Sequence, residues 1–209
     1  MIDFSRDYVF VKVNAKEDTI TAQQYGIVGF PTVVLLNPSG EEIDRILGYR
    51  GPEPFVQQIE QYLAGKGTFP SVLKELEADP DDVKLLFKVA EGYYGRGKLA
   101  EAIDHYEKVV WYDQWNEKEK SDAAIYYIGV SHRKNREYEK AADQFQRLMD
   151  TYPRSPLTPD AIVYKAYVYQ KGGKKADAIA TYERFIQDYP LHDDVQWARE
   201  QIEELKGKQ

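Results

Sequence analysis

Two different periods of hydrophobic and polar positions divide this chain. Within the first 65 residues, the apolar runs Tyr8–Val13 and Thr32–Leu36 have the length and β-branched composition of strands. The turn Asn37–Gly40 places proline second and glycine fourth, as a type I turn prefers. It therefore predicts that Glu42–Gly48 returns as a third strand, antiparallel to the second.

Two short helices are expected around these strands. Asp18–Tyr25 is followed by Gly26, which suits the left-handed position after a helix end. Pro52–Leu63 carries its apolar residues at helical spacing on one face, and Gly65 ends it. The predicted order is β-α-β-β-α, which is a small α/β module over residues 1–65.

From Asp82 onward a longer period appears, in which one sequence pattern occurs three times. Small residues recur at Ala102, Ala141 and Ala178, 39 and then 37 residues apart. An aromatic residue lies four positions after each of these small residues. A second small residue lies upstream of each, on the preceding predicted helix. Small residues let two antiparallel helices approach, and the aromatic ring fills the space toward the next pair. The aromatic positions are Tyr106, Phe145 and Tyr182, and the second set of small positions is Ala90, Gly129 and Ala166.

This pattern resembles the tetratricopeptide repeat (TPR) family. The second and third copies also end alike, at Tyr152-Pro153 and Tyr189-Pro190, where proline stops the helix. The resemblance implies three helix pairs, and Asp193–Lys206 is expected to follow them as a capping helix. Before the repeats, Ser71 is expected to cap a short helix over Val72–Ala78.

The first module is similar to a second family. Tyr25–Thr32, followed by a hairpin, Gly48-Tyr49 and an amphipathic helix, resembles the C-terminal half of thioredoxin. The resemblance implies a cis peptide bond before Pro31. By this resemblance, Met1 stands just before the third strand of the thioredoxin fold, so the half with the Cys-x-x-Cys motif is not in this chain. The second strand of that fold, which lies between its third and fourth strands, is then missing as well. Tyr8–Val13 and Thr32–Leu36 would then either pair directly or leave a gap.

The resulting fold class is α+β: a truncated thioredoxin-like module followed by an all-α TPR superhelix. The expected domains are a partial thioredoxin-like domain at 1–65, a linker with a short helix at 66–81, and the TPR array with its capping helix at 82–209. The module is expected to dock on the helical array or to form a homodimer through its exposed strand edge.

Composition removes several classes of function. The chain has no cysteine, so it has no disulfide, thiolate metal site or thiol catalysis of its own. Its net charge of −7 disfavours nucleic acid, and no apolar segment approaches the roughly 18 residues of a membrane span. His105, His132 and His192 lie on different elements without an i, i+4 partner, so we expect no metal and no cofactor.

The candidate site is the inner face of the first helix of each repeat pair, where the TPR family binds ligands. Aromatic and arginine side chains on a concave surface are typical binding anchors. The alternatives are that this face is solvated or filled by the N-terminal module. The lysine/asparagine clamp for chaperone tails is not matched, because Phe87 and Glu91 stand at its first positions. The partner-binding residues by this register are Phe87, Glu91, Tyr94, Tyr126, Val130, Arg133, Lys134, Val163, Tyr167, Gln170 and Lys171.

These observations favour a non-catalytic scaffold that binds a peptide or protein. The alternative is the cysteine-free part of a longer thioredoxin-family oxidoreductase whose active-site half precedes Met1. The cytoplasm is the default compartment, with export if a targeting segment precedes Met1. In the loop after Asp113, Trp115 is either a small hydrophobic plug or a contact for a partner.

Overall fold

The structure is a computed structural model that describes residues 8–49 and 51–207. The chain forms two compact units, one up to Ala102 and one from Ile103 onward, and each is described here by itself. The division falls inside a helix, so the first repeat helix shares a unit with the N-terminal module. The expected domain boundaries at residues 65 and 82 mark changes of fold type rather than the limits of these units, and they remain a prediction.

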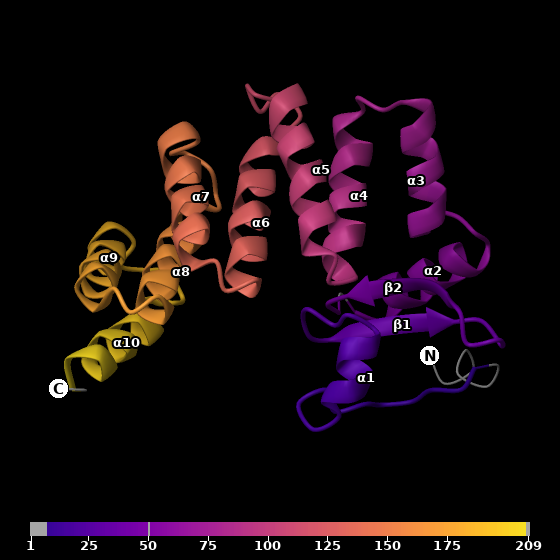
Figure 1. The fold of residues 1–209 in the computed structure, drawn as a ribbon, viewed down its shortest axis with the longest axis horizontal. Helices are drawn as coiled ribbons and strands as arrows, with labels where there is room; N and C mark the ends of the chain where they lie inside the picture. The colour runs from indigo at the N-terminus through magenta and orange to yellow at the C-terminus, as the bar shows by residue number, and fades with distance from the viewer. Residues whose placement is uncertain (1–7, 50, 208–209) are drawn as a thin grey trace. The chain divides into compact units, whose positions relative to one another are not determined.

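The N-terminal module is a β-hairpin with flanking helices, and the rest of the described chain is helical (Figure 1). The hairpin pairs β1 with β2 in antiparallel register, Thr32 opposite Leu47 and Leu35 opposite Asp44. The Gly40 amide donates to the Asn37 carbonyl at 2.9 Å and closes the predicted turn. The elements are α1 (Thr19–Gln24), β1 (Thr32–Leu36), β2 (Glu42–Leu47), α2 (Pro52–Leu63), α3 (Phe69–Ala78), α4 (Val83–Gly95), α5 (Leu99–Tyr112), α6 (Ser121–Lys134), α7 (Tyr138–Thr151), α8 (Thr158–Lys171), α9 (Lys175–Asp188) and α10 (Val195–Gly207).

The prediction of a strand at Tyr8–Val13 is wrong. This segment has no regular structure, and no backbone hydrogen bond joins residues 9–13 to another described residue. Of the two options that the sequence left open, direct pairing with Thr32–Leu36 does not occur. A β-strand is stabilised by hydrogen bonds to an adjacent strand, and no described segment pairs with residues 9–13. β-propensity alone therefore does not make this segment a strand.

The hairpin module has almost no hydrophobic core of its own. Among its described apolar residues, from position 8 to 63, only Ile59 is buried. No residue of β1 is buried, and Val9 is 92% exposed. The large hydrophobic side chains left exposed are Val9, Phe10, Val11, Val13, Ile20, Phe30, Leu36, Leu47, Tyr49 and Leu63.

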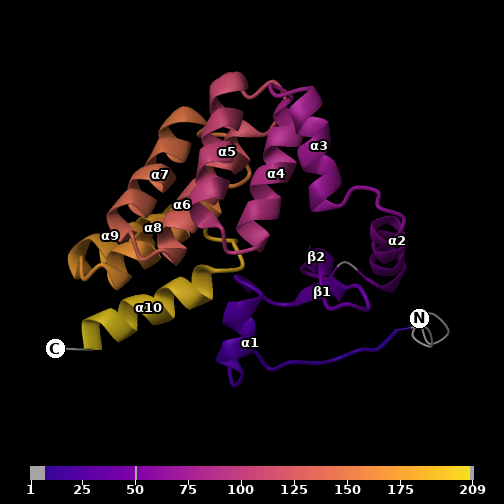
Figure 2. The ribbon, with the colours of Figure 1, turned by 45° about the vertical axis from the view of Figure 1, so that its right-hand side comes forward.

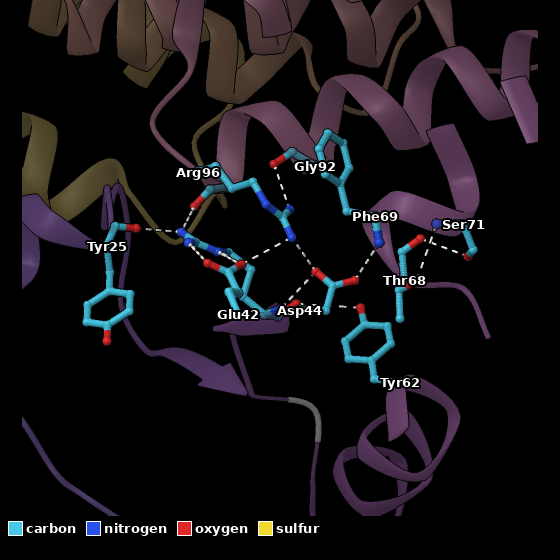
Figure 3. A network of polar contacts seen from close by, with 11 residues as sticks. Tyr25, Glu42, Asp44, Tyr62, Thr68, Phe69, Ser71, Gly92 and Arg96 are labelled. Atoms are coloured by element: carbon cyan, nitrogen blue, oxygen red, sulfur yellow. Dashed lines mark hydrogen bonds and ion pairs between the residues drawn. The ribbon is translucent and has the colours of Figure 1, made fainter. Parts of the chain in front are cut away.

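A buried polar network holds the hairpin on α3 and α4 instead (Figure 3). Asp44 of β2 accepts hydrogen bonds from the Phe69 amide and from Arg96 Nη2, both at 2.7 Å. Arg45 donates to the Gly95 carbonyl at 2.6 Å and forms an ion pair with Glu42. Within the first unit, charged groups of β2 therefore hold the module against α3 and the end of α4, the first repeat helix.

Two glycines permit this close approach. Gly95 has no side chain where Leu47 lies, and an added Cβ would stand 2.5 Å from Leu47 Cδ1. Gly26 has φ +58°, and an added Cβ would overlap the Arg96 carbonyl oxygen. The left-handed conformation predicted for Gly26 is thus combined with a backbone-to-backbone contact that no larger residue allows.

The helix before the repeats starts earlier than expected. α3 begins at Phe69, and its N-cap is Thr68 rather than Ser71, since the Thr68 hydroxyl accepts from the Ser71 amide. Pro70 occupies the first turn, where backbone N–H groups have no acceptor within the helix, so a proline costs no hydrogen bond there. Asp82 caps α4, and its carboxylate accepts from the Leu85 amide at 2.8 Å.

The small and aromatic repeat positions form the core of the helical region. Ala102, Ala141 and Ala178 are fully buried, as are the aromatic residues that follow them. At Gly129 of α6, an added Cβ would stand 2.8 Å from the Phe145 ring of α7, so the ring occupies the space of the missing side chain. Contacts join α6 to α7, α7 to α8, α8 to α9, and α9 to α10. The predicted stacking of helix pairs is confirmed for these elements.

The last helix covers the end of the stack, as predicted. α10 packs against α9 (Figure 2), with Ala198 and Ile202 buried in a cluster that includes Tyr182 and Phe185. Trp197 lies at the edge of the same cluster.

The loop between α5 and α6 is organised by Asp113 rather than by an aromatic plug. The Asp113 carboxylate accepts from the Lys118 amide at 3.0 Å, and its carbonyl accepts from Ser121 Oγ at 2.7 Å. Trp115 is 78% exposed, so the interpretation of this residue as a hydrophobic plug is wrong.

Candidate protein-binding surface

The predicted binding residues are divided between the two compact units. Phe87, Glu91 and Tyr94 lie on α4, in the first unit, where Phe87 is buried. The others lie on α6 and α8 in the second unit, at spacings of three and four residues that place them on one helix face. The geometry below concerns the second unit alone.

Arg133 of α6 is the centre of this surface. Its guanidinium carbon lies 5.1 Å from the centroid of the Tyr164 ring and 5.9 Å from that of Tyr167, both on α8. Such cation–π contacts hold the side chain in place without neutralising its charge. Arg133 forms no ion pair with a carboxylate of the described residues, and its buried Nε has no hydrogen-bond partner.

A framework of aromatic rings supports this arginine. Tyr164 stacks on Phe145 with 5.8 Å between ring centroids. Tyr126 of α6 meets Tyr164 edge-on at 5.8 Å. Burial raises the pKa of Tyr126, and the neighbouring Tyr164 raises it further, so its hydroxyl remains protonated at neutral pH.

A pocket of about 270 Å³ opens beside Arg133. Trp197 of α10 forms one wall, with its ring centroid 6.4 Å from that of Tyr167. Asp194 contributes the one carboxylate of the lining. The lining residues are Arg133, Val163, Tyr164, Tyr167, Asp194 and Trp197.

Two lysines lie next to residues that line this pocket. Lys171 Nζ lies 5.2 Å from the centroid of the Tyr167 ring, and its side chain is exposed. Burial lowers the pKa of Lys134, and repulsion from Arg133 lowers it further. Positive charge is thus concentrated on the face that was predicted to bind a partner.

Other predicted positions serve the packing of the repeats. Val130 is buried in the core. The Gln170 amide oxygen accepts from the Tyr182 hydroxyl at 3.1 Å, and its nitrogen donates to Gln201 at 3.2 Å. Gln170 therefore connects α8 to α9 and α10, and its polar groups are already used.

Sequence reasoning missed three members of the pocket. Tyr164 is next to the predicted Val163, but one residue along a helix turns the side chain by about 100°. Trp197 and Asp194 belong to the capping helix and the turn before it, which a register based on the repeats leaves out. The signal that could have revealed Trp197 is a large aromatic residue on a terminal helix.

His192 lies between two carboxylates that sequence spacing did not connect. Its Nε2 is 3.6 Å from Asp160, and its Nδ1 is 3.8 Å from the Asp194 carboxylate. The Asp194 amide donates to Nδ1 at 3.2 Å, so that nitrogen is already used. With at most three candidate ligands where a structural zinc site takes about four, we interpret the cluster as a link between α8 and the turn before α10.

Comparison with known proteins matches the two parts of the chain separately. Residues 3–63 match the family model of the thioredoxin-like domain. Residues 118–199 match the YfiO family model of an outer membrane lipoprotein. The chain joins a thioredoxin-like segment to TPR-like helical repeats. The Phe30–Pro31 peptide bond is cis, which is the geometry that the thioredoxin resemblance implies.

Sequence relatives cover short stretches. The outer membrane protein assembly factor BamD of Xylella fastidiosa is 43% identical over 51 residues, which is 24% of this chain and 18% of that protein. Chloroplastic thioredoxin M4 of Arabidopsis thaliana is 38% identical over 61 residues, 29% of this chain and 31% of its own length. The thioredoxin of Chlamydia caviae is 33% identical over 51 residues, 24% of this chain and 49% of its own length. The chain thus spans less than a fifth of the BamD relatives.

Solved structures are similar over more of the chain. The crystal structure of MamA has 26% identity and a TM-score of 0.57, covering 71% of this chain and 83% of that one. A Podosopora anserina protein with kinesin light chain TPR-like repeats has 12% identity and a TM-score of 0.56, covering 77% and 90%. The second similarity shows the fold alone. None of the described helices combines the length and the apolar character that crossing a membrane requires.

Proposed function

We propose that this chain is a non-catalytic scaffold that binds a peptide or protein through the concave face of its repeats. The observation that supports this is Arg133, a half-buried cation that contacts two tyrosine rings and forms no ion pair with a described carboxylate. A guanidinium held in one orientation is prepared for a planar, bidentate acceptor. The adjacent pocket offers Tyr167 and Trp197 as apolar walls.

The partner chemistry that fits is a carboxylate next to an apolar side chain. The carboxylate binds Arg133, with Lys171 as a second cation, and the apolar group enters the pocket. Asp194 on the rim disfavours a second acid at that point. The net charge of −7 does not forbid an acidic ligand, because salt screens charges beyond about 8 Å at physiological ionic strength. Local cations therefore decide the contact.

The relatives agree with a role in holding proteins together. BamD is named as an assembly factor, and its similarity falls on a short part of this chain. The MamA likeness, which covers 71% of this chain, supports the repeat architecture. Neither names a partner for this chain.

Selection from a displayed library of random 12-residue peptides tests the proposal. We expect enriched peptides to carry Asp, Glu or a free C-terminal carboxylate beside an aliphatic or aromatic residue. Their affinity, measured by fluorescence anisotropy, should fall at least about tenfold in Arg133→Met, which is the loss expected for a charge-assisted hydrogen bond. Arg133→Lys keeps the charge without the planar fork and should lose less.

Arg199→Met is the matched control, because Arg199 of α10 is exposed and has no ion pair in the described chain. It should change affinity by less than about twofold. Failure to select any binder, or binders that tolerate Arg133→Met, would refute the proposal. Thermal melts of each variant show whether a loss of binding reflects a loss of fold.

A second candidate is that the chain is the cysteine-free part of a longer thioredoxin-family oxidoreductase. The match of residues 3–63 to the thioredoxin-like family supports it. Because disulfide exchange requires a thiolate, such activity would need residues outside this chain. Sequencing the DNA upstream of Met1 tests this: an open in-frame extension encoding a Cys-x-x-Cys or selenocysteine equivalent favours it, and an immediate stop codon other than UGA removes it.

A further inference from the structure

The pocket beside Arg133 carries charges of both signs. Arg133 of α6 supplies the positive charge, and Asp194, which precedes α10, supplies the negative charge. The two side chains do not form an ion pair with each other, because no carboxylate oxygen of the described chain lies within 4.0 Å of the Arg133 guanidinium nitrogens. The pocket therefore presents two separate charges to a ligand.

The Asp194 carboxylate has no lysine or arginine beside it in the described chain. Among those residues it meets the ring of His192, whose Nδ1 lies 3.8 Å away. That nitrogen accepts a hydrogen bond from the Asp194 amide at 3.2 Å, so in this arrangement it carries no proton. A second carboxylate, that of Asp160, lies 3.6 Å from Nε2 of the same ring. The charge at this wall of the pocket is therefore negative, which suits a cation.

A tryptophan ring adjoins this carboxylate. The Ala198 amide donates to the Asp194 carbonyl at 2.8 Å, so Asp194 opens the helical hydrogen bonding of α10. Residues three apart on a helix are neighbours on its surface, and Trp197 follows Asp194 at that spacing in the pocket lining. Lysine and arginine combine a methylene stem with a charged end. The stem suits the indole ring, and the charge suits both the carboxylate and the face of that ring.

We propose that this pocket selects a peptide that carries both an acidic and a basic residue, with the base held by Asp194 and Trp197. The acid binds Arg133 as in the proposed function, on which this inference rests. The methylene stem of the base is then the apolar group that enters the pocket. Asp194 thus determines which apolar side chain is accepted, and the ligand has mixed rather than purely acidic charge.

An uncharged aliphatic or aromatic side chain is the competing occupant. It would cover Asp194 without offering a partner, and a carboxylate that loses water without gaining a cation is destabilised. A lysine or arginine avoids this penalty.

The geometry of an extended peptide sets the spacing of the two charges. Side chains two positions apart lie on the same side of the chain, about 7 Å from each other. This separation is comparable with the width of a space of about 270 Å³. We therefore expect the ligand to have the form acid-x-base or base-x-acid.

Selection from a peptide library with one fixed acid tests this spacing. Each displayed 12-residue peptide has glutamate at its sixth position and random residues elsewhere. Against the native chain, lysine or arginine should be enriched at the fourth or eighth position. Against Asp194→Asn this enrichment should disappear, whereas Asp193→Asn should preserve it. Asp193 is the matched control, because it is exposed, carries the same charge and is not part of the pocket lining.

Replacing the basic residue of a selected peptide by norleucine removes the charge and keeps the stem. Fluorescence anisotropy should show at least about fivefold weaker binding to the native chain, the combined effect of an ion pair and a cation–π contact. In Asp194→Asn this difference should shrink to about twofold, which is the share of a cation–π contact at an exposed site. Thermal melts of the variants show whether each remains folded.

The outcomes separate this inference from the proposed function. Binders that depend on Arg133 but show no enrichment of a base would overturn the role of Asp194 alone. The same conclusion would follow from an equal norleucine effect in the native chain and in Asp194→Asn, or from an equal loss of enrichment in Asp193→Asn. Failure to select any binder, or binding that tolerates Arg133→Met, would overturn the proposed function and this inference together.

Discussion

The hairpin module and the helical repeats are stabilised by opposite kinds of contact. In the repeats, alanine and aromatic side chains are fully buried at every repeated position. In the hairpin, the buried residues of β2 are Asp44 and Arg45, and Ile59 is the one buried apolar residue of the described module. The repeats therefore carry their own hydrophobic core, whereas the hairpin depends on directional polar bonds to a helix of the repeats.

Deleting an aromatic ring from the repeat core should have the largest effect. Phe145→Ala removes the ring that fills the space beside Gly129 and stacks on Tyr164, so we expect a loss of about 3–5 kcal/mol. Urea unfolding followed by tryptophan fluorescence measures it, since Trp111, Trp115 and Trp197 all lie beyond residue 102. Leu191→Ala, which trims a 96% exposed side chain, should stay within about 0.5 kcal/mol. An unchanged urea midpoint for Phe145→Ala would contradict the assignment of the core.

Removing the acid of the hairpin network should have the next largest effect. Asp44→Ala leaves the Phe69 amide without its acceptor and leaves Glu42 as the one carboxylate of the described chain that pairs with Arg96. We expect about 3 kcal/mol of destabilisation, confined to the first unit. Hydrogen exchange of the β2 and α4 amides should accelerate, while the tryptophan-detected transition remains in place. Asp81→Ala, at an exposed turn, is the control. Equal effects of both variants would show that the network does not hold the hairpin.

A smaller effect is expected from filling the space where the backbone at Gly26 contacts the Arg96 carbonyl. Gly26→Ala must adopt a left-handed φ and also overlaps the Arg96 carbonyl, so we expect about 2–3 kcal/mol of destabilisation. Gly40→Ala has a similar φ of +83° and open space around it, so it carries only the conformational cost of about 1 kcal/mol. The difference between the two, measured by hydrogen exchange, isolates the close approach. A difference near zero would mean that the turn at Gly26 moves freely away from α4.

The smallest expected effect is the loss of hairpin stability when the pH is lowered and Glu42 is protonated. Burial alone would raise the pKa of Glu42, but the hydrogen bond and charge of Arg45, together with Arg96, hold it below its usual 4.5. The stabilisation by this carboxylate is therefore complete above about pH 4.5 and is lost as the pH falls below that value. Exchange rates of the β2 amides at pH 6, 4.5 and 3.5, corrected for intrinsic chemistry, should reveal this loss. In Glu42→Gln the pH-dependent part should disappear; persistence of the full acid response would assign it to other groups.

The sequence predicts the repeats better than the hairpin because their information is local and repeated. Gly129 and Phe145 lie 16 residues apart and occur at positions that the other copies share, so their contact follows from the register. The link from Asp44 to Arg96 spans 52 residues and occurs once, so no period signals it. Tyr8–Val13 shows the opposite error, because its composition favours a strand and the structure forms none there.

The residues of the candidate surface likewise include some that the repeat register predicts and some that it does not. Arg133 and Tyr167 follow from the helical register and meet in the structure. Trp197 does not, because the helix that carries it stands outside the repeat pattern. Periodicity therefore finds the side chains that one helix presents and misses those that a capping element brings from elsewhere.

The hold of Arg45 on the Gly95 carbonyl has a consequence for how such a chain changes over evolutionary time. Repeat arrays commonly grow and shrink by duplication or loss of whole units. Here the opening repeat carries the glycine that admits Leu47 and the arginine next to it that binds Asp44. We therefore expect an exchange of the opening repeat to disrupt the hairpin, because it would remove these contacts.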